Sequence, residues 1–197
     1  MRVDLQNGVV IEDPVAVVRG FIEEGWVDLA DPPRPASFDE ADLRRANRGG
    51  ARIAATEIAA ILERRHRIER ALRAIDPATS LAGPASSVPW PALRELFDAF
   101  AGIRGVGFSK MTKALHPKRP ALIPMLDSFV QRYLEDHDPG AEAPFGERVI
   151  ALVRGYRREL LHNRTALRAV QRELGRRGHS LTEVRILDLL IWSVEAR

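Results

Sequence analysis

The sequence predicts a mainly α-helical protein with one short β-hairpin, and three observations support this fold class. Apolar residues recur at three- and four-residue spacing over most of the 197 residues, which is typical of amphipathic helices. Residues that favour helix N-caps precede several of these stretches. Alternation of the kind found in strands is confined to the first eleven residues. Because this length suits one domain, we expect residues 1–197 to form a single, two-lobed helical domain.

The amino-terminal elements are predicted from turn and cap residues. Residues 2–11 alternate around Asn7-Gly8, a pair that suits the tight turn of a β-hairpin. Asp13 followed by Pro14 predicts the start of a helix that runs to about residue 24. The stretch Ser37-Phe-Asp-Glu40 has the spacing of a capping box, with Ser37 as the cap.

The helix after this box is expected to end near Asn47, because Gly49-Gly50 follows. The apolar stripe that comes next predicts one long helix from about Ile53 to Ile75. Residues 76–89 are rich in Ala, Ser, Pro and Gly, so we expect a loop there and place the lobe boundary in it.

Six helices are expected in the remainder of the chain, one of them over residues 128–134. Residues 91–101 and 108–115 are predicted to form an antiparallel pair around residues 105–107. The last three are expected at about 145–161, 164–176 and 181–195. The final helix follows Ser180-Leu-Thr-Glu183, which has the spacing of a second capping box.

Composition excludes several classes of site. The chain has no cysteine, which rules out disulfides, cysteine–zinc and iron–sulfur sites and a thiol nucleophile. Its five histidines show no metal-ligand spacing, and no phosphate-binding or dinucleotide-binding fingerprint is present. We therefore expect neither a metal nor a cofactor. The start of the chain does not resemble a signal peptide, and the run at 186–194 is too short to span a bilayer. A cytoplasmic protein with no membrane partner is expected, while its oligomeric state is not determined by the sequence.

The lysines suggest where an anionic partner would bind. Only three of the 30 basic residues are lysines, and all three lie between residues 110 and 118. A general preference for arginine codons in a GC-rich genome accounts for this composition, as does a local face that binds phosphate.

The segment from 91 to 135 carries most of the functional information. Gly105-Val106-Gly107 lies between two predicted helices, where bare amides and a helix N-terminus can approach a phosphate oxygen. Lys110 and Lys113 follow in the next helix, and we expect them to contact phosphate too. The alternative for the glycines is a simple tight connection between helices, and the alternative for Lys110 is a solvated side chain.

This segment resembles the HhH-GPD (helix-hairpin-helix) superfamily of DNA glycosylases. The resemblance consists of the Gly105-Val106-Gly107 hairpin, Ser109 two residues later, and Ile123-Pro-Met-Leu-Asp127, with the aspartate 18 residues beyond the serine. It is closest to the adenine-mismatch branch. Met111 departs from the small residue usual at that position. The remainder of the chain resembles an uncharacterised bacterial family, through ANRGGARIA at 46–54 and SLTEVRILD at 180–188.

The resemblance implies roles for two residues. Lysine at the position of Ser109 would form a Schiff base, so serine there implies a monofunctional enzyme. Asp127 would then be the catalytic carboxylate, which stabilises the positive charge that develops on the sugar during base release. The alternative is that Asp127 only caps the helix that follows it.

A base taken out of a duplex needs a pocket. The candidates to line it are Asn47, Arg48 and Tyr133, with Trp26, Trp90 and Phe129 as further aromatic residues; the alternatives are helix termination for the first two and core packing for the aromatic residues. The sequence thus predicts a DNA-binding protein that contacts the phosphate backbone of duplex DNA, with monofunctional base excision as the enzymatic hypothesis. The alternative is a non-catalytic helical domain that binds DNA or another protein.

Overall fold

A computed structural model describes residues 2–26 and 34–196, and it confirms the mainly helical class with a short amino-terminal hairpin. The described residues form ten α-helices, a two-stranded sheet and three short 3-10 turns. The strands are β1 (Val3–Asp4) and β2 (Val10–Ile11). The helices are α1 (Pro14–Glu23), α2 (Glu40–Arg48), α3 (Ala55–Glu63), α4 (Arg65–Arg73), α5 (Trp90–Asp98), α6 (Phe108–Leu115), α7 (Ser128–Tyr133), α8 (Phe145–His162), α9 (Arg164–Arg176) and α10 (Glu183–Glu195). The 3-10 turns are η1 (Ala85–Ser87), η2 (His116–Lys118) and η3 (Glu135–His137).

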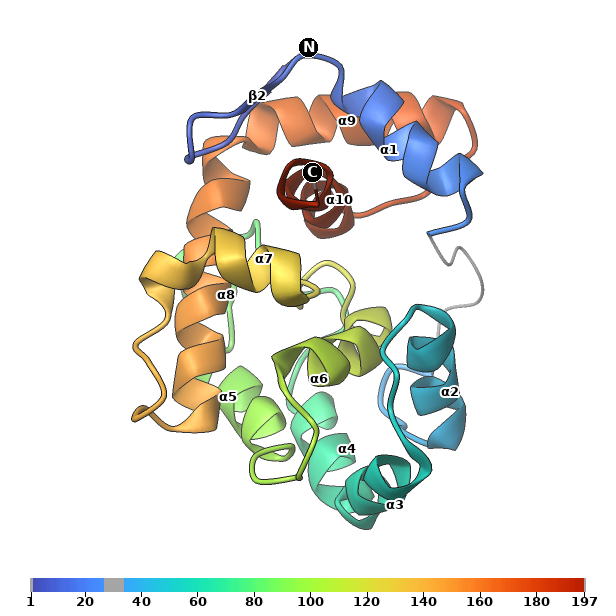
Figure 1. The fold of residues 1–197 in the computed structure, drawn as a ribbon, viewed down its shortest axis with the longest axis vertical. Helices are drawn as coiled ribbons and strands as arrows, with labels where there is room; N and C mark the ends of the chain where they lie inside the picture. Colours follow the sequence, from blue (N-terminus) through green and yellow to red (C-terminus); the bar gives the residue numbers. More distant parts are fainter. Residues whose placement is uncertain (1, 27–33, 197) are drawn as a thin grey trace.

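The helices form two groups that are joined along α8 (Figure 1). The hairpin, α1, α9 and α10 lie at one end of the molecule, and α2 to α6 lie at the other. The two ends of the chain therefore meet, since α1 packs on α9 and α10. Helix α5 packs mainly on α4 and α8, whereas α6 packs mainly on α2. The sequence predicts that α5 and α6, on either side of residues 105–107, pack against each other as an antiparallel pair. In the structure each of them packs mainly on other helices instead.

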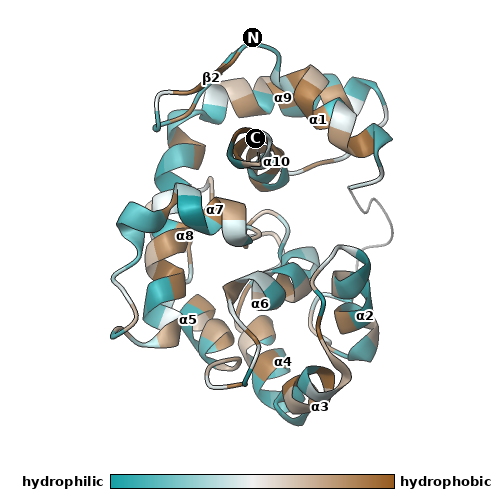
Figure 2. Ribbon diagram, in the orientation of Figure 1, coloured by the Kyte–Doolittle hydropathy of each residue, from teal (hydrophilic) through white to brown (hydrophobic). Residues whose placement is uncertain are grey.

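The core runs through both groups, and most helices carry apolar residues beside polar ones (Figure 2). Helix α10 is the most enclosed: residues 186–191 are all buried, including Asp188. It contacts α1, α7, α8 and α9, so no side of this stretch is left for solvent. A helix surrounded in this way is buried around its whole circumference rather than on one stripe.

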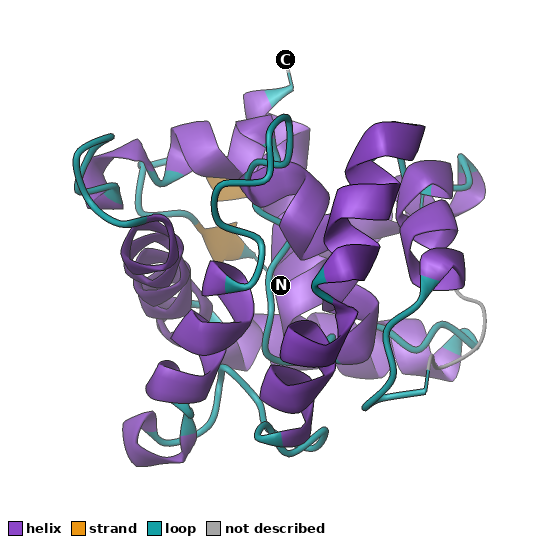
Figure 3. Ribbon diagram, turned by 90° about the horizontal axis from the view of Figure 1, so that it is seen from below, coloured by secondary structure: helices purple, strands orange, loops and turns teal. Residues whose placement is uncertain are grey.

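The predicted amino-terminal hairpin is present, with β1 antiparallel to β2 and Gly8 in the left-handed region at φ +85°. Figure 3 shows its two strands, in orange, among the helices. Its backbone is tied to α8, because the Asn163 side chain bonds both the N–H and the carbonyl of Asp4. The buried Glu159 carboxylate accepts the Gln6 N–H at 3.1 Å. A two-stranded ribbon is marginal by itself, so these contacts hold it in place.

Both predicted helix caps are displaced by two residues, and a capping box is present at the first of them. The cap of α2 is Asp39, which forms a box with Asp42, and the cap of α10 is Thr182, whose hydroxyl accepts the Arg185 N–H. In each case the serine proposed as the cap lies one half-turn too early. The spacing rule alone does not distinguish two candidates that lie so close together.

The long helix predicted over 53–75 is wrong, since α3 ends and α4 begins at Arg64. The Arg64 guanidinium donates to the carbonyl oxygens of Ala99 and Ala101, at the end of α5. A cation at a helix C-terminus satisfies free carbonyls there. The break at Arg64 thus comes with a tertiary contact that periodicity does not show.

Residues 76–89 form the expected loop, which includes η1. It is fixed on two sides: Leu81 N–H donates to Ala121 O, and the Arg157 guanidinium of α8 donates to the carbonyls of Leu81 and Gly83. That this loop divides two lobes stays a prediction.

Candidate functional site

Position 105 requires glycine, because α3 lies too close to leave room for a side chain. Its φ is +82°, and a Cβ built on it would lie 2.2 Å from Glu57 Oε1. The Glu57 carboxylate in turn receives two 2.7 Å hydrogen bonds from Lys110 Nζ. Burial disfavours the charged form of Glu57, yet the bonds from Lys110 and from the Ala54 N–H hold its pKa below the ordinary value. The hairpin therefore carries a carboxylate against its first glycine, and Lys110 neutralises it.

The rest of the hairpin is less constrained. Val106 is buried, and Gly107 is the exposed cap residue of α6 with open space where a side chain would be. Ser109 lies half-buried in the first turn of α6.

The three lysines lie in different surroundings. Lys110 is paired with Glu57, and Lys118 is buried in a 2.7 Å ion pair with Asp42. Within the described part of the chain, Lys113 has no carboxylate within ion-pair distance, and its ammonium donates only to Gly50 O, at 3.5 Å. Of the predicted lysine-rich face, Lys113 is thus the lysine without an ion pair in the described structure, because Lys110 and Lys118 are each paired with a carboxylate.

Two arginines that the sequence analysis did not single out lie near Lys113. Its ammonium interacts electrostatically with the Asp127 carboxylate and with the guanidinium groups of Arg185 and Arg52. Burial and the two guanidinium groups lower the pKa of Lys113, while Asp127 raises it. We call Arg52, Lys113, Asp127 and Arg185 the cationic cluster. Its four residues come from four segments, the α2–α3 connection, α6, the start of α7 and α10, and three positive charges face one negative charge.

The backbone around Arg52 is held in an unusual conformation. Arg52 has φ +54°, and it is the non-glycine residue of the described chain with a positive φ. Asn47 fixes this turn, since its side-chain amide donates to Ile53 O and accepts the Ile53 N–H at 2.6 Å. The Asn47 amide is therefore occupied by its own loop, whereas Arg48, at the end of α2, is exposed. A left-handed arginine is strained, and such strain is concentrated at functional sites.

Asp127 caps α7, as the sequence predicts. Its Oδ1 accepts the N–H groups of Phe129 and Val130, both at 3.1 Å. No described residue donates a hydrogen bond to its other oxygen, Oδ2. The cap thus fixes the orientation of the carboxylate and leaves one oxygen for a ligand.

A second carboxylate lies behind the cluster. Asp188 is 2% exposed, and its Oδ2 accepts the Met125 N–H at 3.2 Å, two residues before Asp127. Its Oδ1 is buried with no hydrogen-bond partner in the described structure. Burial raises the pKa of Asp188 to about 7, against the opposing effects of the Arg185 charge and the Met125 N–H. Asp188 therefore holds the segment that leads to Asp127.

The remaining candidate, Tyr133, serves the amino-terminal hairpin. Its hydroxyl donates to Glu159 Oε2 at 2.5 Å and accepts the Gln6 N–H at 3.1 Å. Burial and the Glu159 carboxylate raise the pKa of this phenol. The structure thus assigns Tyr133 a structural contact away from the cationic cluster.

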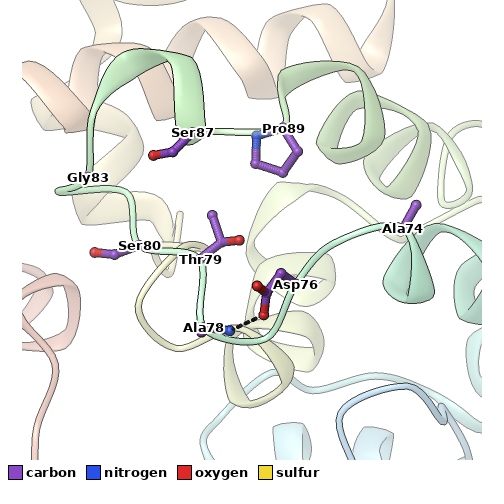
Figure 4. A pocket seen from close by; sticks show the side chains of 8 residues that line it. All are labelled: Ala74, Asp76, Ala78, Thr79, Ser80, Gly83, Ser87 and Pro89. Carbon is purple, nitrogen blue, oxygen red and sulfur yellow. Dashed lines mark hydrogen bonds between the residues drawn. The ribbon is translucent and has the colours of Figure 1, made fainter.

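A surface hollow with a volume of about 520 Å³ lies elsewhere, over the 74–89 loop (Figure 4). Small and hydroxyl-bearing residues line it, with Asp76 as its charged member. The Asp76 carboxylate accepts the Ala78 N–H at 2.8 Å. This hollow has no cation to bind an anion and contains none of the residues singled out from the sequence.

Residues 2–26 and 34–196 contain no cluster of three or more histidine, aspartate or glutamate side chains arranged to hold a metal ion. None of their helices combines the length and the apolar character needed to cross a membrane.

Comparison with known proteins identifies the family. The model of DUF6308, a family of unknown function, matches residues 26–195. The match spans most of the chain, including all four residues of the cationic cluster, so the protein belongs to this family. No curated protein and no solved structure matches it.

Proposed function

We propose that this member of the DUF6308 family binds the phosphate backbone of DNA at the cationic cluster. The observation that carries the proposal is the half-buried Lys113 ammonium, which has no carboxylate within ion-pair distance in the described structure and on which the charges of Arg52 and Arg185 act. Three cations from separate segments leave a net positive site, and phosphate is the anion that such a group of basic side chains commonly binds.

The surroundings of Lys113 support this assignment. A buried or half-buried ammonium is costly unless it is paired. Lys110 and Lys118 each have a carboxylate at 2.7 Å. Lys113 is half-buried next to two further cations. The Asp127 carboxylate acts on this ammonium from beyond ion-pair distance, and an incoming phosphate would bring a negative charge closer to it.

The main phosphate contact then lies at Lys113 and not at the glycine hairpin, where the sequence predicted it. A phosphate at Gly105 would meet the Glu57 carboxylate, which lies against that residue. Two anions at one place repel, so binding there would require Glu57 and Lys110 to separate. At Lys113 no ion pair has to separate, and the three cations of the cluster outnumber its one carboxylate, Asp127.

Binding is tested by fluorescence anisotropy with a labelled 20-base-pair duplex over a range of salt concentrations. Lys113→Met should weaken binding of every duplex sequence alike, and it should reduce the slope of log affinity against log salt by about one. Arg176→Met removes the same charge from an exposed arginine of α9 and should leave affinity and slope unchanged. Equal effects of the two substitutions, or no binding of the wild-type protein at low salt, would refute the proposal.

A second candidate function, monofunctional base excision, is favoured by the free oxygen of Asp127. A fixed carboxylate next to a bound phosphate backbone lies within reach of the adjoining sugar, where it can stabilise positive charge during cleavage of the bond to the base. Because Ser109 cannot form a Schiff base, the expected product is an intact abasic site, and borohydride should trap no covalent complex.

The test is a panel of duplexes that carry mismatched, oxidised, alkylated or deaminated bases. Asp127→Asn retains a side chain that can cap α7, so it should abolish base release while the protein stays folded and bound. Release that survives this substitution removes Asp127 from the mechanism. An absence of release from every duplex leaves DNA binding as the function.

A further inference from the structure

Trp26 is the most exposed large apolar residue of the described chain, with 56% of its surface accessible. It is nevertheless held in place. Its Nε1–H donates to Glu24 Oε2 at 3.1 Å, and its ring lies 5.5 Å from that of Trp192, at 49° to it. Phe129 contacts the same Trp192 ring at 5.6 Å, edge to face. We call Trp26, Phe129 and Trp192 the aromatic platform.

This platform lies next to the cationic cluster. The Arg185 guanidinium donates to Trp26 O at 3.2 Å, and its other terminal nitrogen contacts Met125 Sδ at 3.4 Å. Phe129 follows Asp127 by two residues and donates its N–H to that carboxylate. The aromatic platform and the cationic cluster are therefore adjacent, joined by the bonds from Arg185 to Trp26 and from Phe129 to Asp127.

A fixed, exposed aromatic ring next to several cations fits one ligand in particular. A nucleotide presents a flat base for stacking and a phosphate for the cations, and bases stack on aromatic side chains whatever their sequence. Inside a duplex each base already stacks on its neighbours, so an outside ring can receive only an unpaired base. Charge complementarity with the cluster thus favours a nucleic acid strand over an apolar peptide.

We propose that Trp26 is a stacking platform for an unpaired base of a DNA strand whose phosphate lies at Arg185 and Lys113. This inference rests on the proposed function, because the cluster must bind the backbone first. It adds a specificity: the protein binds single-stranded DNA, or an unpaired position in a duplex, more tightly than a fully paired duplex.

The experiment measures the affinity of the full chain for a labelled 15-residue oligothymidine and for a fully paired duplex of equal length. Trp26→Leu keeps an apolar side chain but removes the aromatic face, so it should weaken oligothymidine binding about 5- to 150-fold. Duplex binding should change less than twofold, and Trp26→Phe should restore most of the single-strand affinity. Val10→Ala, at another exposed apolar residue, is the matched control and should change neither affinity. Circular dichroism should show all three variants folded, since both altered side chains are exposed.

The outcomes separate the two proposals. If the wild-type protein binds neither oligonucleotide at low salt, the proposed function fails. If it binds DNA but Trp26→Leu leaves the single-strand affinity intact or lowers both affinities equally, only the stacking proposal is overturned. Self-association that Trp26→Leu abolishes without any effect on DNA binding would assign the ring to a protein contact instead, and would equally overturn it.

Discussion

Two buried titratable groups, His116 and Asp188, give a prediction about how stability depends on pH. His116 lies at the end of α6 with its ring enclosed, and its Nδ1 is 2.6 Å from Ile123 O. Burial, with the nearby Arg185 charge, lowers the pKa of His116 to about 4. Burial raises the pKa of Asp188 to about 7. Both groups are therefore uncharged in the folded protein across much of the range from pH 4 to 7.

The two shifts act on stability in opposite directions. The folded pKa of His116 is below its unfolded value of 6.5, so the unfolded chain binds the extra proton and stability falls as the pH drops from 6.5 to 4. The folded pKa of Asp188 is above its unfolded value of 3.8, so the folded chain binds the extra proton and stability falls as the pH rises from 4 to 7. At about 1.4 kcal/mol per pH unit, the effects amount to about 3 kcal/mol for His116 and about 4 kcal/mol for Asp188. They largely cancel in the wild-type protein.

Two conservative substitutions separate these effects. Asparagine at 116 keeps a donor for Ile123 O, and asparagine at 188 keeps an acceptor for the Met125 N–H. The free energy of unfolding is measured by urea denaturation at several pH values from 4.5 to 7.5, and each variant is compared with the wild type at the same pH. Relative to the wild type, His116→Asn should lose about 3 kcal/mol of stability as the pH rises through this range, and Asp188→Asn should gain about 3 kcal/mol, because the range begins above the unfolded pKa of Asp188.

Other titrating groups contribute equally to the variants and the wild type, so they drop out of these differences. The double variant should show the sum of the two changes, apart from the coupling through Arg185, which interacts with both groups. A variant curve that runs parallel to that of the wild type would refute the assigned burial of that group.

Three further predictions concern named contacts. Arg119 is 1% exposed and donates to four carbonyl groups, including those of Leu72 and Ile75. Arg119→Met leaves these buried carbonyls unpaired, so it should lower the free energy of unfolding, measured by urea denaturation, by about 3 to 5 kcal/mol. A loss below about 1 kcal/mol would contradict this network. Gly105 and Gly102 both have a positive φ, but a Cβ at Gly105 would lie 2.2 Å from the Glu57 carboxylate, whereas one at Gly102 would have no atom within 4 Å. Gly102→Ala should therefore destabilise the protein by about 1 kcal/mol, and Gly105→Ala should destabilise it by more. Equal losses would show that the Glu57 contact does not contribute. Burial and nearby cations lower the pKa of Lys113, so its charge is present at low pH and is lost as the pH rises through that lowered pKa. DNA affinity, measured from pH 7 to 10, should therefore fall at a lower pH than the ordinary lysine pKa would predict. Lys113→Arg should abolish this fall.

Local sequence signals were sufficient wherever neighbouring residues determine the structure. The Asn7-Gly8 turn, the Asp13 cap of α1 and the Asp127 cap of α7 each involve residues at most three positions apart. Helix α9 has the predicted limits, since its apolar stripe and its ends are also local. Where two caps compete two residues apart, as at Ser37 and Asp39, the same local rules did not choose between them.

The tertiary structure decided which charged residues remain available to a ligand. Lys110 and Lys113 look equivalent in the sequence, but Glu57, 53 residues away from Lys110, pairs with that lysine alone. Arg52 and Arg185 approach Lys113 from opposite ends of the chain. The two segments that resemble a bacterial family, at 46–54 and 180–188, do contain these arginines, and that resemblance was the one sequence signal for them. The sequence by itself therefore determined the helical class, most helix limits and the position of Asp127, because these depend on residues close in the chain. Only the folded structure decided which cations surround that carboxylate, because ion pairing depends on distances in space.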